Sequence, residues 1–478
     1  MSVLNKATFN PRVVSAEYAV RGAIVLRSNE YQKQLAAGAE LPFDKIIPCN
    51  IGNPQILGQK PIHFHREVLA LVNVPGLVDH PEAPSIFKED AIARAKHYLA
   101  KIPGGTGAYG HSKGHEVIRH EVCDFLERRD GYPADPETIF LTDGASQAVQ
   151  GILRALIRDE NDGILVPIPQ YPLYSATIAM NGGSLCGYYL DEAASWGTST
   201  DELKRAIEAG REAGKEVRAL VVINPGNPTG QCLSENNMRD IVQICKDEKL
   251  VLMADEVYQE NVYTEDKHFV SFKKVLKDMG PDFDDVELAS FHSTSKGFTG
   301  ECGRRGGYME LVNFTAEAME QFYKMVSVNL CSNIEGQLMV GMMTNPPVEG
   351  DASYESYISQ RDGVLESLKR RALKLVAAFN ELEGVTCNAA EGAMYTFPKI
   401  TVPEKACEEA KERGMAPDAF YATALLDATG IVVVPGSGFG QEDGTYHFRS
   451  TILPPEEAID EVIEKTSKFH AEFMDKYR

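Results

Sequence analysis

Short apolar runs alternate with longer helical patterns through the middle of the chain. Runs of this length, bounded by turn residues, are typical of buried strands. The expected strands are Ile139–Thr142, Ile164–Pro167, Leu220–Asn224, Val251–Ala254 and Leu288–Phe291. Helices are expected between them at 144–157 and 235–248. Such alternation predicts a mainly parallel sheet covered by helices on both faces.

The two ends of the chain have a different pattern. One helix, Tyr18 to Leu35, is expected before Gly38 and Pro42 break the pattern. The remaining expected helices are 64–72, 89–100, 357–382 and 420–428, and the remaining expected strands are 431–434 and 446–451.

These patterns predict an α/β protein with three parts. Residues 1–45 form an N-terminal arm, and residues 101–345 form the large domain that holds the sheet. Residues 46–100 and 346–478 together form a small α+β domain, in which helices pack on a small sheet.

The composition narrows the classes of partner. The net charge of −21 argues against nucleic acid and anionic membranes as main partners. No stretch approaches the roughly 20 apolar residues of a membrane helix. The nine cysteines are dispersed without metal-like spacing, which indicates reduced thiols and no metal. Because Met1–Arg12 lacks the features of a targeting segment, we expect a cytoplasmic protein, although a removed presequence would not be visible.

One lysine follows the expected strand at Leu288. In Phe291–Phe298, three hydroxyl-bearing residues precede Lys296, and Arg304 follows soon after. A lysine partly desolvated at the end of a strand is available to attack a carbonyl carbon. Ser293 and Arg304 are suited to hold a phosphate. Together they indicate pyridoxal phosphate, whereas the alternative is a solvated lysine in a surface turn.

Other polar residues also follow expected strands, where a ligand of an open α/β sheet binds. Ala145 and Ser146 open a helix whose N-terminus suits an anion, although Ser146 alone could be a helix cap. Asn227 lies in a turn with two Asn-Pro pairs, where its amide could reach a phenolic oxygen. Asp255 ends an apolar strand and could pair with a protonated pyridine nitrogen, or cap the next turn; Tyr258 could donate to the ring oxygen.

Three further residues are candidates. Tyr171 could stack on a planar ring, and Tyr109 lies in the glycine-rich segment Gly104–Ser112, which is not a Walker A loop. Arg449 lies within an apolar strand, where its guanidinium could bind a substrate carboxylate or form a structural ion pair.

The order of these motifs resembles the class I, fold-type I PLP-dependent aminotransferases over nearly the whole chain. The motifs are Gly144–Ser146, Asn224–Gly230, Asp255–Tyr258, Ser293–Lys296, Arg304–Gly306 and the late Arg449. Segments such as Tyr18–Gly22, Gly300–Gly307 and Phe448–Pro454 are similar to the alanine aminotransferase branch. The resemblance implies a seven-stranded sheet in the large domain and a homodimer.

The resemblance also implies a role for each residue. Lys296 would form the aldimine with pyridoxal phosphate and move the proton, and Asp255 would pair with the pyridine nitrogen. Arg449 would bind the substrate carboxylate with the Gly52 backbone, and Tyr109 would reach the cofactor of the partner subunit. Arg305 is left without a role. The remaining cofactor contacts would come from Ala145, Ser146, Tyr171, Asn227, Tyr258, Ser293 and Arg304.

The implied reaction transfers an amino group between L-alanine and 2-oxoglutarate, giving pyruvate and L-glutamate. One alternative keeps the chemistry and exchanges glutamate with glyoxylate. A second is a PLP enzyme that eliminates or cyclises. A third, the aminotransferase-like half of a transcription regulator, needs a basic helix-turn-helix extension for which the short arm leaves no room.

Overall fold

A seven-stranded sheet forms the centre of the molecule in the computed structural model, which describes residues 3–18 and 22–478. Its strand order is β2-β8-β7-β6-β5-β3-β4. All neighbours are parallel except β8, which runs antiparallel to both β2 and β7. The strands are β2 (Ile139–Asp143), β3 (Asp162–Ile168), β4 (Ser184–Tyr189), β5 (Glu216–Ile223), β6 (Val251–Asp255), β7 (Leu288–Ser293) and β8 (Gly306–Val312). The expected mainly parallel seven-stranded sheet is confirmed.

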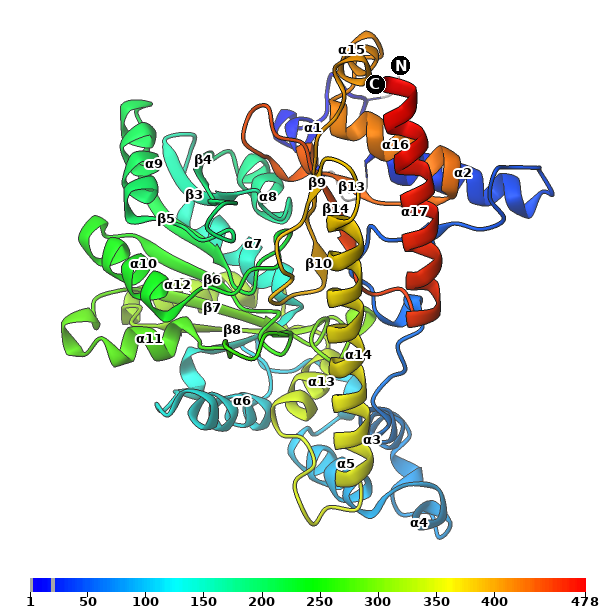
Figure 1. Cartoon of the computed structure of the whole chain (residues 1–478). Helices are drawn as coiled ribbons and strands as arrows, with labels where there is room; N and C mark the ends of the chain where they lie inside the picture. The colour runs from blue at the N-terminus through cyan, green and yellow to red at the C-terminus, as the bar shows by residue number, and fades with distance from the viewer. Residues whose placement is uncertain (1–2, 19–21) are drawn as a thin grey trace.

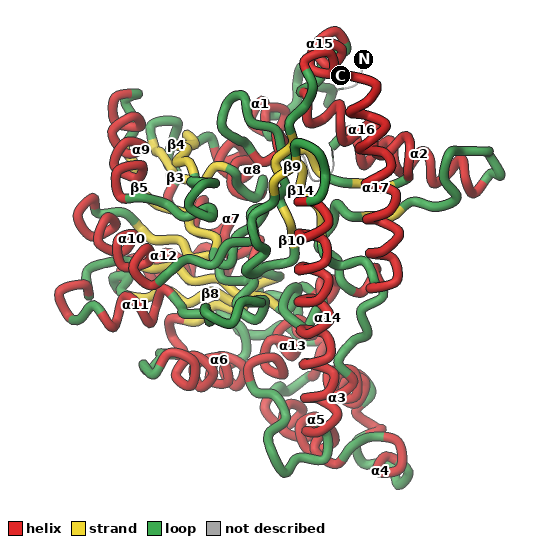
Figure 2. Tube along the Cα trace, viewed as in Figure 1, coloured by secondary structure: helices red, strands yellow, loops and turns green. Residues whose placement is uncertain are grey.

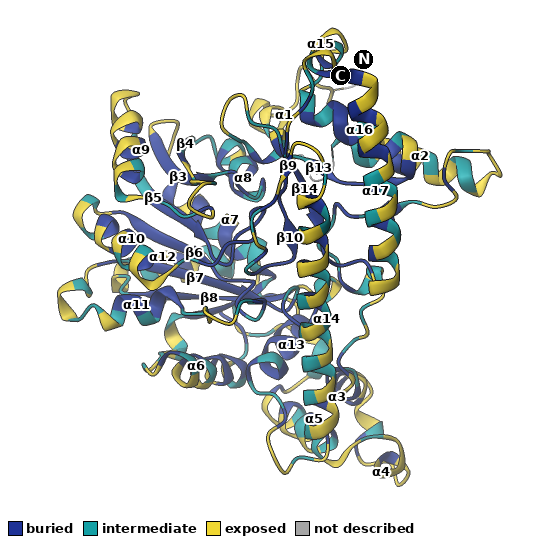
Figure 3. Cartoon of the chain, in the orientation of Figure 1, coloured by how far each residue is buried: buried dark blue, intermediate teal, exposed yellow. Residues whose placement is uncertain are grey.

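Helices cover both faces of this sheet, as Figure 2 shows. Leu220 and Val222 of β5 pack toward α9 (Thr200–Glu212), α10 (Glu235–Glu248) and α11 (Phe272–Asp278). Ala219 and Val221 pack toward α7 (Ala145–Leu156), α8 (Leu173–Asn181) and α12 (Ala316–Ser327) on the other face. Successive side chains of a strand point to opposite faces, so a run that is apolar throughout feeds two cores. Figure 3 shows the inner strands β6, β7 and β8 as buried.

A third core lies beside β2 and β8. It joins α6 (Glu116–Asp130) and α13 (Ile334–Thr344) with α3 (His63–Asn73) and α5 (Glu89–Lys101), and the short α4 (Ala83–Ile86) lies next to α5. Apolar residues of segment 62–102 therefore share a core with the edge of the large sheet at β2 and β8. Nothing in the sequences of α3 and α5 indicates which surface their apolar faces cover, so the sequence pattern could not show where these helices pack.

The small α+β unit is built from both ends of the chain. β1 (Ile47–Pro48) pairs in parallel with β12 (Ile431–Val432), and Cys49 lies in the same core as Phe448. Two further small sheets comprise β10 (Tyr395–Thr396), β14 (Phe448–Thr451) and β13 (Val434–Pro435), and β9 (Val385–Thr386) with β11 (Lys399–Ile400). The helices of the small unit are α14 (Tyr354–Asn380), α15 (Glu404–Glu412), α16 (Pro417–Thr429) and α17 (Glu456–Tyr477). Helices α14 and α17 lie side by side in Figure 1.

The N-terminal arm contacts both parts of the molecule. The short α1 (Pro11–Ser15) packs on α8, where Arg12 donates to the Asn181 carbonyl at 3.2 Å. The longer α2 (Ala23–Ala36) packs on α16 through a 2.6 Å ion pair between Arg27 and Asp427. The helix expected from Tyr18 begins at Ala23, and residues 19–21 of the Tyr18–Gly22 motif lie outside the described residues.

Capping chemistry explains where several helices begin and end. Ser234 accepts a 3.2 Å hydrogen bond from the Asn237 backbone N–H, and Lys249 ends α10 in a left-handed conformation. The expected segment 235–248 matches α10; Ser234 is a start signal that the sequence shows, whereas the left-handed conformation of Lys249 is a feature of the structure alone. β4 and β8 were not recognised: Ser184 and Gly187 interrupt the apolar run of β4, and β8 begins with two glycines.

Across residues 3–18 and 22–478, no helix has the length and apolar character needed to cross a membrane. The same residues contain no group of histidine, cysteine or carboxylate side chains that could hold a metal ion. All nine cysteines are free thiols.

Candidate active site

A cavity of about 450 Å³ lies at the carboxyl ends of the central strands, against the small unit. Parallel strands bring these ends to one edge of the sheet, so residues far apart in sequence meet there. Among the sequence-predicted residues, the cavity is lined by Gly52, Ala145, Ser146, Tyr171, Asn227, Asp255, Tyr258, Ser293, Lys296 and Arg449. Two predicted residues do not line it, Tyr109 and Arg304.

Lys296 extends from the loop after β7 into this cavity. Its Nζ donates a 2.9 Å hydrogen bond to the Gly52 carbonyl oxygen and lies 5.7 Å from the centre of the Tyr258 ring. Gly297 follows with φ 64°, a conformation that glycine adopts without strain, and its N–H donates to Asn261 Oδ1 at 2.9 Å. These contacts hold a primary amine in the middle of the cavity.

Asp255 ends β6 with its carboxylate almost fully buried, at 5% exposure. It accepts a 2.9 Å hydrogen bond from the Tyr174 hydroxyl and a longer one from the Val257 N–H. Burial raises the pKa of Asp255 to about 6, although the bond from Tyr174 opposes this shift. Among the described residues no cation forms an ion pair with it, so the site provides an anion that a protonated ring nitrogen would complement.

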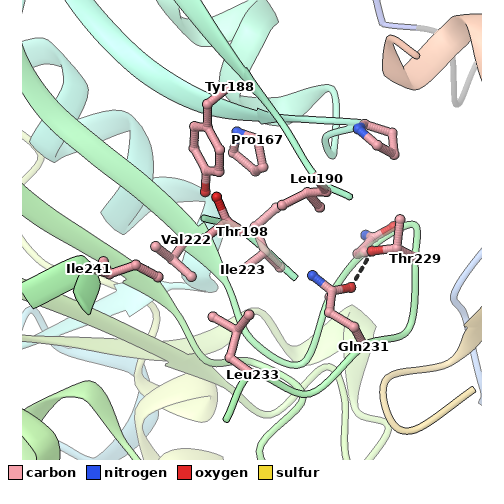
Figure 4. A pocket seen from close by; sticks show the side chains of 13 residues that line it. Pro167, Tyr188, Leu190, Thr198, Val222, Ile223, Thr229, Gln231, Leu233 and Ile241 are labelled. Carbon is pink, nitrogen blue, oxygen red and sulfur yellow. Dashed lines mark hydrogen bonds between the residues drawn. The ribbon is translucent and has the colours of Figure 1, made fainter. Parts of the chain in front are cut away.

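Asn227 is held by the turn that follows β5. The Leu233 N–H donates to Asn224 Oδ1 at 3.0 Å, and the Thr229 hydroxyl donates to Gln231, as Figure 4 shows beside a small pocket behind the turn. The Asn227 amide donates to Tyr258 Oη at 3.5 Å. The turn therefore places Asn227 at the cavity, where Tyr258 and Arg449 hold the two polar atoms of its amide.

Arg449, in the middle of β14, is one of the largest fully buried side chains. Its Nη1 donates to Asn227 Oδ1 at 3.0 Å, and its Nη2 donates to the Asn50 carbonyl at 2.5 Å. No described residue accepts a hydrogen bond from its Nε. A buried guanidinium without a carboxylate partner suits an anionic ligand.

The opposite end of the cavity can hold a phosphate. Ala145 and Ser146 form the first turn of α7, whose preceding residue Gly144 makes no side-chain cap, so the first backbone N–H groups remain available. Ser293 and Arg305 line the same end. Arg305 Nη2 donates to the Asp143 carbonyl at 3.1 Å and lies against Gly144, where a side chain would collide with it.

The arginine at this end is therefore Arg305, and the expectation for Arg304 is corrected. Arg304 forms an ion pair with Glu335 and does not line the cavity. Arg305 follows the turn Cys302–Arg304 with φ 53°, so the backbone reverses and the two neighbouring side chains leave in different directions. The Arg-x-Gly pattern fits either residue, which is why the sequence could not separate them.

Several residues of the cavity were missed, namely Tyr18, Ile51, Asn53, Cys302 and Tyr395. Tyr395 lies in a mostly apolar segment that is typical of a buried core, and only its hydroxyl could have indicated a place in the site. Tyr18 Oη lies 2.7 Å from Tyr171 Oη. Tyr109 lies outside the cavity and is 81% exposed.

The residues present fit pyridoxal phosphate. A helix N-terminus with an arginine suits its phosphate, and the central amine can bond its aldehyde carbon. The buried Asp255 complements a pyridinium nitrogen, while Asn227 and Tyr258 can meet the phenolic oxygen. Once these groups are matched, Arg449 remains free for a carboxylate of the substrate.

Comparisons with known proteins agree with this assignment. A family model described as aminotransferase class I and II matches residues 82–465. Alanine aminotransferase 2, mitochondrial, of Arabidopsis thaliana is 57% identical over 98% of this chain and 88% of that relative. Glutamate–glyoxylate aminotransferase 2 of the same plant is 51% identical over 100% and 98%.

Solved structures show the same likeness. An alanine aminotransferase from Pyrococcus furiosus superposes with a TM-score of 0.77 at 26% identity, covering 97% of this chain and 99% of that one. Because the family model spans most of the sequence, its description applies to the chain as a whole. The protein belongs to the class I and II aminotransferases, enzymes that depend on pyridoxal phosphate.

Proposed function

We propose that the protein is an alanine aminotransferase, which transfers the amino group reversibly between L-alanine and 2-oxoglutarate. The observation that carries this proposal is the 57% identity, over nearly the whole chain, to relatives named alanine aminotransferase. Relatives named glutamate–glyoxylate aminotransferase are 51% identical. The buried Arg449 supports a substrate that has a carboxylate, since every participant of this reaction carries a carboxylate next to the reacting carbon.

Each residue has a defined task in this reaction. Arg449 binds the substrate carboxylate, and Arg305 with the first turn of α7 holds the phosphate of the cofactor. Asp255 keeps the ring nitrogen protonated, so that the bound cofactor can accept the electron pair left on the substrate carbon. Lys296 Nζ would act as general base, taking the proton from that carbon, and would later give the proton up as general acid.

A panel of substrate pairs tests the proposal. L-alanine and L-glutamate are assayed as donors against 2-oxoglutarate, pyruvate and glyoxylate, and kcat/KM values are compared. We expect the highest values for alanine with 2-oxoglutarate and for the reverse pair, glutamate with pyruvate. A higher value for glutamate with glyoxylate would favour the second candidate, and elimination of the amino group without a keto acid would exclude both.

We also propose a homodimer in which Tyr109 reaches the phosphate site of the partner subunit. Its 81% exposure in a single chain leaves the side chain accessible to another subunit. The test mixes Tyr109→Ala subunits with Lys296→Ala subunits. In a mixed dimer, one site contains an intact Lys296 together with the intact Tyr109 of the other subunit, so we expect partial recovery of activity. A monomer in solution, or no recovery on mixing, would contradict the proposal.

A cytoplasmic location is proposed on the dispersed free thiols and the character of Met1–Arg12, although relatives from Arabidopsis thaliana and Dictyostelium discoideum are named mitochondrial. Fusion of a fluorescent protein to the C-terminus of the full-length gene product tests it. Diffuse fluorescence throughout the cytoplasm is expected, whereas co-localisation with a mitochondrial dye would contradict it.

A further inference from the structure

A directed chain of hydrogen bonds ends at a tyrosine that has no assigned role. Arg449 donates to Asn227, the Asn227 amide donates to Tyr258, and the Tyr258 hydroxyl donates to Tyr395 Oη at 3.3 Å. Tyr395 thus accepts a hydrogen bond, but among the described residues none accepts the proton of its own hydroxyl. A buried donor without an acceptor is energetically unfavourable, so such a group indicates a partner that the protein itself does not supply.

The Tyr395 hydroxyl, which has no acceptor for its own proton among the residues that the structure describes, lies in the same cavity as the Arg449 guanidinium. Arg449 Cζ is 4.1 Å from the centre of the Tyr395 ring and 4.8 Å from the centre of the Phe439 ring, so its cation lies over two aromatic rings. Arg449 Nε also lacks a partner. Two neighbouring residues of one cavity, Tyr395 and Arg449, therefore each have an N–H or O–H to donate.

The hydroxyl also lies close to the reacting amine. A Cβ built on Gly52 would collide with both Tyr395 Oη and Lys296 Nζ, so the two groups are close neighbours across Gly52. The substrate carboxylate is one bond from the carbon whose proton Lys296 removes. A carboxylate bound to Arg449 with that carbon at Lys296 therefore brings one oxygen next to Tyr395.

We propose that the Tyr395 hydroxyl is a second carboxylate-binding group of this site, donating a hydrogen bond to one oxygen of the substrate α-carboxylate while Arg449 binds the other. The carboxylate would complete the ring of hydrogen bonds that begins and ends at Arg449. The proposal rests on the proposed function only for the substrate class, because all four participants of the reaction carry this carboxylate.

The electrostatics of the site agree with this role. Burial, the largest effect, raises the pKa of Tyr395, but the positive charges of Lys296 and Arg449 outweigh it and lower the pKa. A more acidic phenol is a better donor to an anion, and a bond to a charged acceptor is worth more than one between neutral groups.

The variant Tyr395→Phe tests the hydroxyl alone, because it keeps the ring beside Arg449. Cofactor-loaded protein is titrated with propionate, which has the carboxylate but no amino group, and binding is followed by calorimetry. We expect the Kd of propionate to rise about tenfold or more, as for a lost hydrogen bond to a charged group. The KM values of alanine and 2-oxoglutarate should rise together.

Two matched comparisons isolate the effect. Ethylamine, which has the amine but no carboxylate, should bind Tyr395→Phe and wild type equally. Tyr263→Phe removes another buried hydroxyl, which donates to the Ala393 carbonyl at 2.6 Å and does not line the cavity, and it should leave the Kd of propionate unchanged.

An unchanged Kd of propionate in Tyr395→Phe would overturn the proposal, and so would a fall in kcat alone, which would indicate action through Tyr258 or Lys296. If Tyr395→Phe does not fold, 3-fluorotyrosine placed at position 395 keeps the hydroxyl and reports on it. Its fluorine resonance should shift on addition of propionate, and an unmoved resonance would overturn the proposal. Wild-type turnover of alanine tests the proposed function separately, because the propionate measurement does not depend on the preferred amino acid.

Discussion

The Tyr174 hydroxyl donates a 2.9 Å hydrogen bond to Asp255 Oδ2, and both side chains are buried beneath the cavity. Even with this bond, burial raises the pKa of Asp255 to about 6, above its ordinary 3.8. The folded cofactor-free protein therefore binds this proton more tightly than the unfolded chain. Ionisation of Asp255 thus reduces the free energy of unfolding as the pH rises from about 4 through about 6, by on the order of 3 kcal/mol.

The variant Asp255→Asn should remove this pH-dependent loss in the free energy of unfolding. In urea unfolding at pH 8, the cofactor-free variant should be more stable than the wild type, and the difference should narrow toward pH 5. Cofactor binding should reverse the order, because the asparagine cannot pair with a protonated ring nitrogen. A stability difference that grows toward low pH would show that Asp255 has a lowered pKa.

Lys296→Ala should abolish covalent attachment of the cofactor. Borohydride reduction followed by peptide mass analysis should find the cofactor on Lys296 in the wild type and on no peptide in the variant. Turnover should fall by about 100-fold to 10,000-fold, the range that general acid–base catalysis contributes. Lys274→Ala is the matched control, since Lys274 pairs with Asp278 on α11; normal turnover in Lys296→Ala would refute the role.

The two neighbouring arginines should differ in their effect on cofactor affinity. Arg305→Gln removes a cation from the phosphate end of the cavity, and the Kd of pyridoxal phosphate for the cofactor-free protein should rise about tenfold or more. Arg304→Gln removes the ion pair with Glu335 and should change that Kd far less. Fluorescence titration measures both Kd values. A larger rise of the Kd for Arg304→Gln than for Arg305→Gln would indicate that Arg304 holds the phosphate.

Gly52→Ala should impair catalysis more than folding. The added Cβ would collide with Tyr395 Oη and Lys296 Nζ, which must both be positioned for the reaction. We expect kcat/KM to fall about 100-fold or more, as when a reacting group is displaced by about 1 Å. Gly76→Ala, where the new Cβ meets nothing within 4 Å, provides the control for both kcat/KM and Tm. Full activity of Gly52→Ala would show that the site has room there.

The strands that carry the site could be predicted because each is a short apolar run followed by a distinctive polar residue. Asp255 and Lys296 are found in this way, and both line the cavity. β4 escaped recognition, since Ser184 and Gly187 break its apolar run and only pairing with β3 makes it a strand.

Other parts of the site depend on backbone geometry that no residue pattern reveals. Arg304 and Arg305 match the same motif, and only the positive φ of Arg305 decides which side chain enters the cavity. Tyr395 reads as a core residue until β10 and β14 pair and place it beside Arg449. The apolar faces of α3 and α5 could be recognised in the sequence, but an apolar helical face does not specify the surface that it covers.

The pairing of β1 with β12 sets an order of assembly during synthesis. Residues 47–48 cannot find their neighbours until residues 431–432 have left the ribosome, whereas every strand of the central sheet is complete by residue 312. A nascent chain can therefore form most of the cofactor side before Arg449 exists. Premature termination after the central sheet would leave a polypeptide without Arg449, and therefore without the buried guanidinium proposed to bind the substrate.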